Sequence, residues 1–320
     1  MKEIVKLTGT NDKINRSALI SAALLHFCAA AAGFIASKAV VLGNILPFGL
    51  SFLAGSSLTY TPAAAIGVFI GYFIPAVGSG GFRYVAAAFA IVAIKLLLGG
   101  FKKLSSNPIF LSFMTLLASF LTSAVTLSGL NFNFLSALAE ALLAAGGAFF
   151  ICRSFATFKN AAAGLESDEL VSLFVLIGIM IIGINGFEFN GISLGHITGI
   201  AVILTAAKYG GIPSGAICGT ATAFAMNLSG MSGEISVAYA FIGLMAGIFS
   251  SFGKYVQVSV PLVVGLLGSL ISKDPILISQ TVVETALGSA LFLAVPRKAG
   301  IRLGKIFSVY PKLVTPDGFK

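Results

Sequence analysis

The feature that most constrains this chain is a series of apolar runs, many close to 20 residues long, that recur along its 320 residues. A helix of about 20 residues matches the roughly 30 Å hydrocarbon core of a bilayer. Charged residues make up 10% of the chain, against about 25% in a typical soluble domain. A soluble core has no room for this much apolar surface. The sequence therefore predicts an all-α, polytopic transmembrane helical bundle.

Gly, Pro, Asn and charged residues divide the apolar runs into candidate spans. These are 17–37, 45–58, 62–77, 84–101, 109–129, 133–152, 169–185, 192–207, 212–229, 235–252, 256–272 and 276–295. The segments 45–58 and 62–77 are too short to cross without tilt, so a re-entrant helical hairpin is the alternative to two crossings there. We therefore expect about ten spans, in a range of about ten to twelve.

The distribution of basic residues predicts the orientation of the chain. With a cytoplasmic N-terminus, most Lys and Arg residues fall on the cytoplasmic side, and only Lys38, Arg83 and Lys273 fall outside. The positive-inside rule thus places both termini in the cytoplasm. We divide the chain into a cytoplasmic segment (1–16), a transmembrane helical domain (17–296) and a basic cytoplasmic tail (297–320). We expect the tail to lead to a further C-terminal domain that this chain lacks.

The net charge of +9 argues for membrane orientation rather than nucleic-acid binding, because the basic residues form no stripe interleaved with exposed aromatic residues. Cys28, Cys152 and Cys218 stand in separate apolar runs and are interpreted as small hydrophobic residues. The acidic residues 166–169 are expected to be solvated and not to bind a metal. No catalytic, cofactor-binding or metal-binding residue is predicted.

Five ionisable residues fall within or near the end of a predicted span: His26, Lys95, Glu140, His196 and Glu284. A charge in hydrocarbon costs about 2.5–3.5 kcal/mol, so each of these side chains must face protein, water or a partner. Two interpretations stay open for them. The first is interhelical hydrogen bonding, and the second is a role in transport or signalling.

Pairs of glycines four residues apart occur in several apolar runs. Such pairs allow two helix backbones to approach closely, and we favour this packing role for them. The alternative is a set of broken helices that line a substrate path, for which the stretch 209–230 is the best candidate. The paired glycines are Gly67 and Gly71, Gly195 and Gly199, Gly215 and Gly219, and Gly243 and Gly247.

A weak internal similarity connects the two halves of the chain. The segment Tyr60-Thr-Pro-Ala-Ala-Ala-Ile-Gly67 aligns with Gly211-Ile-Pro-Ser-Gly-Ala-Ile-Cys218, with Pro, Ala and Ile at matching positions. Both segments follow a short apolar stretch. The similarity indicates a possible duplication of one half, which the composition of the chain also allows to arise by chance.

Several segments together resemble the membrane region of the stage II sporulation protein E family. The resemblance covers nearly the whole chain and is strongest from about residue 195 onwards. Its segments are Pro47–Gly55, the run Ala-Ala-Ile-Gly-Val-Phe-Ile-Gly-Tyr that ends at Tyr72, Ala207–Gly219, Gly243–Lys254 and Glu284–Pro296. Lys254 and Glu284 match recurring family positions, and we assign them only a packing or anchoring role.

The resemblance implies about ten membrane spans joined to a cytoplasmic regulatory segment and a metal-dependent serine phosphatase domain. In such a protein the phosphatase activates sigma factor F, and manganese or magnesium belongs to the phosphatase domain. This chain lacks that domain, so no catalytic residue carries over. The membrane region is expected to localise at the polar division septum, with a bacterial division protein nearby, and to self-associate.

The leading hypothesis is therefore a membrane anchor, localisation and oligomerisation domain, in contact with the lipid bilayer and with no nucleic-acid partner. The main alternative is a secondary transporter or permease for a small solute, based on the short Gly-interrupted segments and on Glu140 and Glu284. A receptor-like sensor that signals to the missing domain is a third hypothesis, which the sequence does not separate from the first.

Overall fold

The computed structural model describes residues 2–74, 81–126, 133–160, 167–231, 233–272, 274–296 and 298–300. The predicted tail 297–320 lies outside these residues except for 298–300. Of the predicted N-terminal segment 1–16, the backbone of 2–16 is described, as part of the first helix.

The described chain is almost entirely helical. The helices are α1 (Lys2–Ser37), α2 (Phe48–Gly55), α3 (Thr61–Phe73), α4 (Gly81–Leu97), α5 (Lys102–Ser105), α6 (Pro108–Thr126), α7 (Phe134–Asn160), α8 (Ser167–Asn185), α9 (Leu194–Leu228), α10 (Gly233–Ile248), α11 (Lys254–Ser272) and α12 (Pro275–Ala294). Short 3-10 turns follow α4 and α10. The strands β1 (Glu188–Phe189) and β2 (Ile192–Ser193) form a small antiparallel hairpin before α9.

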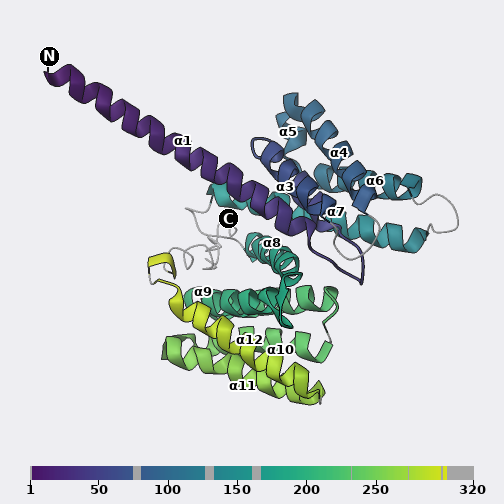
Figure 1. Ribbon diagram of the computed structural model, residues 1–320, viewed down its shortest axis with the longest axis vertical. Helices are drawn as coiled ribbons and strands as arrows, with labels where there is room; N and C mark the ends of the chain where they lie inside the picture. The colour runs from purple at the N-terminus through teal and green to yellow at the C-terminus, as the bar shows by residue number, and fades with distance from the viewer. Residues whose placement is uncertain are drawn as a thin grey trace, which may run out of the picture.

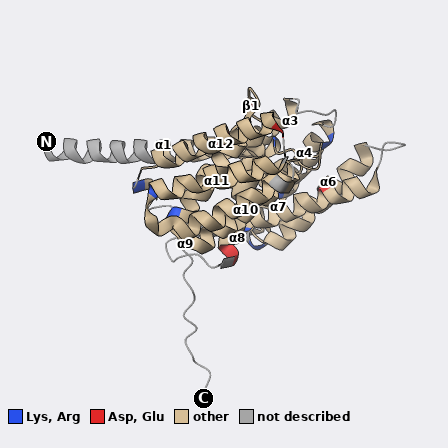
Figure 2. Ribbon diagram, turned by 90° about the horizontal axis from the view of Figure 1, so that it is seen from below, with Lys and Arg blue, Asp and Glu red and all other residues tan. Residues whose placement is uncertain are grey.

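Nine helices of the described residues are long and apolar enough to cross a membrane. They carry many large apolar side chains on their outer surface, such as Phe89, Leu121 and Phe224. Exposed apolar side chains at this density suit a hydrocarbon solvent and not water. Figure 2 shows the Lys, Arg, Asp and Glu residues mostly near helix ends, with uncharged ribbon between them. The prediction of an all-α polytopic bundle is confirmed, whereas the positions of the termini stay a prediction.

Helix α9 replaces two of the predicted spans, 192–207 and 212–229. Its backbone leaves the helical region at Gly211, where φ is +76° and ψ is −162°. The arm 194–210 then packs against the arm 212–228, because a β-carbon at Gly215 would lie 2.9 Å from that of Ala207. In a straight helix these two positions would be about 12 Å apart. The two arms are therefore antiparallel neighbours, joined at a residue that needs glycine.

Helices α2 and α3 are shorter than the predicted spans 45–58 and 62–77. Helix α2 has only 8 residues, all of them buried, and rises about 12 Å, less than half of the hydrocarbon core. The two helices form an antiparallel pair, held by the Tyr72 hydroxyl, which donates to the carbonyl of Leu46 and accepts from the amide of Leu50. The segments 45–58 and 62–77 thus contain two helices that are shorter than the predicted spans. The re-entrant hairpin and the number of crossings stay predictions.

The molecule has two lobes in Figure 1, one formed by α2 to α7 and the other by α9 to α12, with the end of α1 and α8 between them. The element order is similar in the two halves. Helices α1, α2, α3, α4, α6 and α7 have counterparts in α8, the two arms of α9, α10, α11 and α12. In each half the last two helices pack against each other, α6 with α7 and α11 with α12. A duplication of the chain nevertheless stays a prediction.

Candidate functional site

The first half buries Glu140 of α7 against two residues of α4. Glu140 has a side chain that is only 1% exposed, and its Oε2 lies 3.2 Å from Nη2 of Arg83. Arg83 also donates to the Tyr84 hydroxyl, at 2.6 Å, and stacks over the Tyr84 ring. A guanidinium is permanently charged and presents its donors in a fixed geometry. Arg83, Tyr84 and Glu140, the Glu140 cluster, therefore contain a buried ion pair, that of Arg83 with Glu140.

The Glu140 cluster also fixes the start of α2. The backbone amide of Leu46, just before that helix, donates to the Tyr84 hydroxyl at 3.0 Å. The ring of Tyr84 stacks on that of Tyr72, with centroids 5.2 Å apart. The cluster thus connects α4, α7 and the hairpin of α2 and α3 through one continuous set of contacts.

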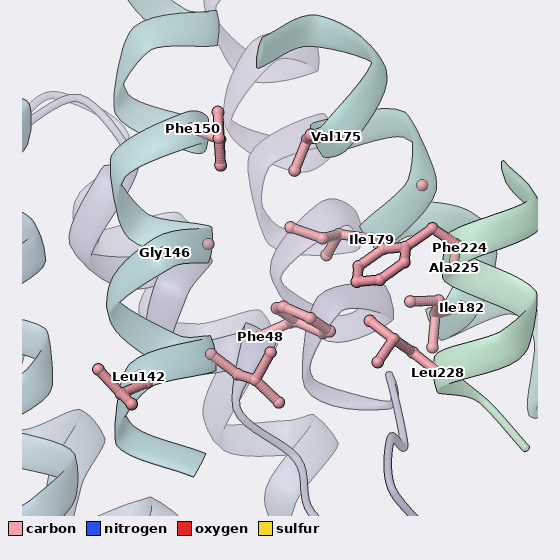
Figure 3. Close-up of a pocket in the computed structure, with 13 residues that line it drawn as sticks. Phe48, Leu142, Gly146, Phe150, Val175, Ile179, Ile182, Phe224, Ala225 and Leu228 are labelled. Atoms are coloured by element: carbon pink, nitrogen blue, oxygen red, sulfur yellow. The ribbon is translucent and has the colours of Figure 1, made fainter. Parts of the chain in front are cut away.

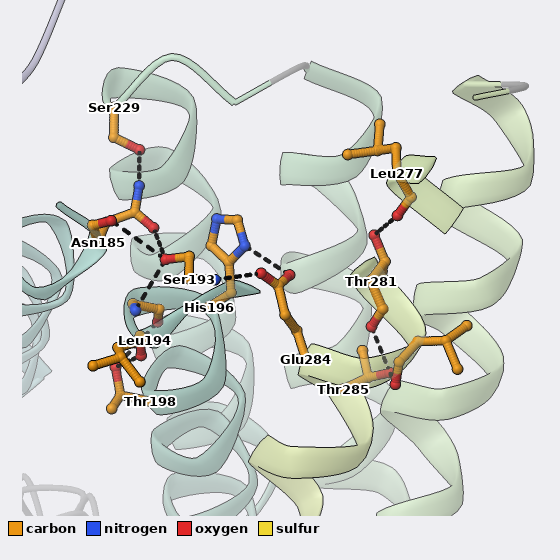
Figure 4. A network of polar contacts seen from close by, with 12 residues as sticks. Asn185, Ser193, Leu194, His196, Thr198, Ser229, Leu277, Thr281, Glu284 and Thr285 are labelled. Carbon is orange, nitrogen blue, oxygen red and sulfur yellow. Dashed lines mark hydrogen bonds and ion pairs between the residues drawn. The ribbon is translucent and has the colours of Figure 1, made fainter. Parts of the chain in front are cut away.

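The second half buries Glu284 of α12 at the start of α9, as Figure 4 shows. Its Oε1 accepts from the Ser193 amide at 2.8 Å, and its Oε2 lies 2.8 Å from Nδ1 of His196. The ring of Tyr239 in α10 stands 6.2 Å from the His196 ring. Ser193, His196 and Glu284, the Glu284 cluster, share the general plan of the Glu140 cluster. A carboxylate from the last helix of each half approaches the start of an inner helix.

Ser193 extends the Glu284 cluster to α8. Its hydroxyl accepts from the Gly195 amide, which caps α9, and donates to Oδ1 of Asn185 at 2.5 Å. Asn185 in turn donates to Ser229 at the far end of α9. The β1–β2 hairpin ends at Ser193, so its position depends on these hydrogen bonds (Figure 4).

Lys95 of α4 is fully buried and caps the C-terminus of α2. Its ammonium group donates to backbone carbonyls of the last turn of α2, those of Leu53 (2.9 Å), Ala54 (3.1 Å) and Ser56 (2.5 Å). The last carbonyls of a helix have no partner within the helix and carry partial negative charge. Lys95 therefore satisfies the end of a helix that stops inside the protein.

The other two ionisable candidates lie away from both clusters. His26 bonds within α1 to the Ala22 carbonyl, and its ring meets that of Tyr60 edge-on. Lys254 donates to the Val295 carbonyl at 2.9 Å and lies over the ring of Phe292, so it ties the start of α11 to the end of α12.

The paired glycines lie where helix backbones come close together. A β-carbon at Gly67 or Gly71 of α3 would collide with α1, whereas one at Gly219 would lie 2.8 Å from the Gly243 Cα in α10. The same overlap is found at Gly195, Gly215, Gly243 and Gly247. Gly199 has more room, since the nearest atom, on Thr222, would be 3.2 Å away. A functional role of these glycines stays a prediction.

Several residues of these clusters were not predicted from the sequence. Arg83 was assigned to the outside, and Tyr84 was not predicted as a neighbour of Glu140. Ser193 and Gln257 were not predicted as functional or structural residues. Buried Gln257 donates to the carbonyls of Leu204 and Ala246, and so connects α11 to α9 and α10. The available signal was the rule that a buried carboxylate needs a cation or amide partner.

Among the described residues no group of three His, Cys, Asp or Glu side chains converges on one point. Two-metal phosphatase chemistry needs several carboxylates around its ions. The residues described here therefore do not fit such a centre, and we derive no catalytic step from them.

These observations define the class of the chain: an integral membrane domain of packed apolar helices with two buried carboxylate clusters. Residues 2–303 match the family described as "SpoIIE, N-terminal domain". The chain belongs to this family, which confirms the resemblance noted above. It is similar to the stage II sporulation protein E of Bacillus subtilis (strain 168), with 24% identity over 282 residues. The alignment covers 83% of this chain and 33% of that relative, and no solved structure matches the chain.

Proposed function

We propose that this chain is the membrane anchor and septal localisation domain of a sporulation protein serine phosphatase, and that it also mediates oligomerisation. The match over residues 2–303 carries the proposal. The chain spans about a third of the length of the curated relative. We assign the phosphatase activity, its manganese or magnesium and the activation of sigma factor F to a further cytoplasmic domain.

The physical role of such a domain is confinement. A soluble domain tethered to a membrane moves in two dimensions, which raises its effective concentration towards like subunits and towards septal partners such as a division protein. Membrane-length helices with exposed apolar side chains supply the tether. The buried side chains of Lys95, Gln257 and Glu284 each make hydrogen bonds to other protein groups, as expected for a stable scaffold.

The test is a fusion of this chain to a fluorescent protein, expressed in a sporulating bacterium. We expect fluorescence at the polar septum, whereas a fusion that lacks residues 17–296 should be diffuse in the cytoplasm. A signal spread evenly over the cell membrane would contradict septal localisation while leaving the anchor intact. Cross-linking of two differently tagged copies in the same membranes tests self-association, which a purely monomeric pattern would exclude.

Secondary transport is a second candidate function, favoured by one specific arrangement. Glu140 and Glu284 each lie buried near the start of an inner helix, and α9 bends sharply between its arms. Buried carboxylates and broken helices also occur at transporter substrate sites. The test measures solute and proton flux in vesicles. Transport predicts that E140Q and E284Q abolish flux in folded protein, and an anchor predicts no flux in the unmodified chain.

A further inference from the structure

A half-open apolar groove lies between the two halves of the molecule. Figure 3 shows α7 on one side of it, α8 along it and the end of α9 on the other side, with Phe48 of α2 nearby. All of its lining residues are glycine or apolar, and its volume is about 200 Å³. Helix α8 packs against both α7 and α9. The groove is thus the space between α7 and α9, on the two sides of α8.

Small residues of α7 and α8 make the groove deep. Gly147 and Gly178 are buried, whereas Gly146 lies partly open on the groove wall. A β-carbon at Gly146 would meet no atom within 4 Å. Larger apolar side chains, Leu142 of α7 and Phe224 of α9, stand on the rim with 54% and 65% of their surface exposed. The groove therefore opens sideways, towards the surface that faces hydrocarbon in a membrane.

An empty slot of this kind would leave its lining atoms without contact partners, and in a bilayer such contacts are the main source of packing energy. The size of the slot selects what can fill it. A benzene molecule fits a cavity of about 150 Å³. The groove, at about 200 Å³, therefore has room for part of a single hydrocarbon chain, and its apolar lining offers that chain contacts.

We propose that this groove binds one acyl chain of a membrane phospholipid, which fills the contact between the two halves of the domain. The lining residues lie on the half of α8 that ends at Asn185. By the predicted orientation this half faces the extracytoplasmic leaflet, which would supply the lipid. The bound chain is a structural ligand, and it makes the packing of α7 against α8 and α9 depend on the surrounding bilayer.

The test uses the absence of tryptophan from the sequence. F224W places one fluorophore on the rim of the groove, and L121W places one on the outward face of α6, where Leu121 is 57% exposed. Both positions lie near the end of their helix. Each variant of the full chain is titrated in detergent with phosphatidylcholine that carries bromine, a quencher of tryptophan, on its acyl chains. We expect half-maximal quenching of F224W at a lipid fraction about tenfold lower than for L121W.

G146L, combined with F224W, places a larger side chain on the groove wall, where a β-carbon meets no atom within 4 Å, and should bring the two titrations together. G100L is the matched control, because a β-carbon at Gly100 also meets no atom within 4 Å, and it should leave the difference unchanged. Equal titration of the two tryptophans, or no effect of G146L, would overturn the proposal. So would preferential quenching of F224W by a brominated fatty acid alone, or quenching that depends on protein concentration, which would indicate a second copy.

Discussion

The two halves of the bundle bury one carboxylate each, and they stabilise it differently. In the first half Glu140 lies beside the guanidinium of Arg83, whose charge is permanent. In the second half Glu284 accepts a hydrogen bond from the Ser193 amide and lies beside the imidazole of His196. The same element order thus supports an ion pair in one half and a polar network with two partners in the other. Removal of Arg83 should leave the Glu140 carboxylate without a cation. Removal of His196 should leave Glu284 its hydrogen bond from the Ser193 amide, as a reserve.

The largest effect is expected from R83M. It removes the cation beside a carboxylate that is 1% exposed, and an uncompensated buried charge destabilises by about 3–5 kcal/mol. Reversible unfolding in mixed detergent micelles measures this change. The double variant R83M/E140Q should recover most of the loss, because it removes the unpaired charge. Equal instability of the single and double variants would show that Arg83 acts by packing alone.

A substitution at the glycine of the first half that lies closest to a neighbouring helix backbone should follow. G67A places a β-carbon on the backbone of α1 at Ala30, and overpacking of this kind costs up to about 3 kcal/mol. G219A, against Gly243 in the second half, should cost less, because the overlap is smaller. G146A, in open space, is the control and should unfold like the unmodified chain. A null result for G67A would mean that α1 moves freely relative to α3.

H196L tests the reserve of the second half. Glu284 keeps the Ser193 amide in this variant, so we expect a loss of about 2 kcal/mol, within the range for one lost partner of a buried polar group. The change should be clearly smaller than that of R83M under the same conditions. If H196L destabilises as much as R83M, the two clusters are equivalent and the contrast between the halves fails.

The smallest effect is expected from the tyrosines. Y84F removes a hydroxyl that accepts from both Leu46 and Arg83, and should cost about 1 kcal/mol. Y239F should cost less, since the Glu284 carboxylate contacts Ser193 and His196. Denaturation of the two variants side by side ranks them, and the reverse order would assign the Glu284 carboxylate a stronger bond to Tyr239.

The sequence predicted the membrane-length helices well, and it predicted poorly the elements whose length is set by neighbours. Helices α6 and α12 follow their predicted spans closely, because composition and length decide whether a segment enters hydrocarbon. The run 45–58 was read as a span, but the structure ends α2 after 8 residues. Lys95 explains this end, since its ammonium satisfies the final carbonyls of α2 from a distant part of the chain.

The candidate site was predicted by residue type but not by partner. Glu140, Glu284 and Lys95 stood out because an ionisable side chain in an apolar run is expensive. The partner Arg83 was counted only as a basic residue at the outer end of a span, since such a residue fits the orientation rule without any buried partner. Ser193 contributes a backbone amide, which leaves no trace in residue type.

The sequence by itself determined that this chain is a bundle of membrane-length helices, because transfer into lipid depends on composition summed over about 20 residues. The sequence also placed the chain in the SpoIIE N-terminal domain family. Only the tertiary structure decided that α9 turns back at Gly211, that Lys95 caps α2, and that each half encloses one carboxylate with its own partners. These features rest on contacts between residues that are far apart in the chain. Such contacts are set by the packing of whole helices, which the local pattern of residues does not specify.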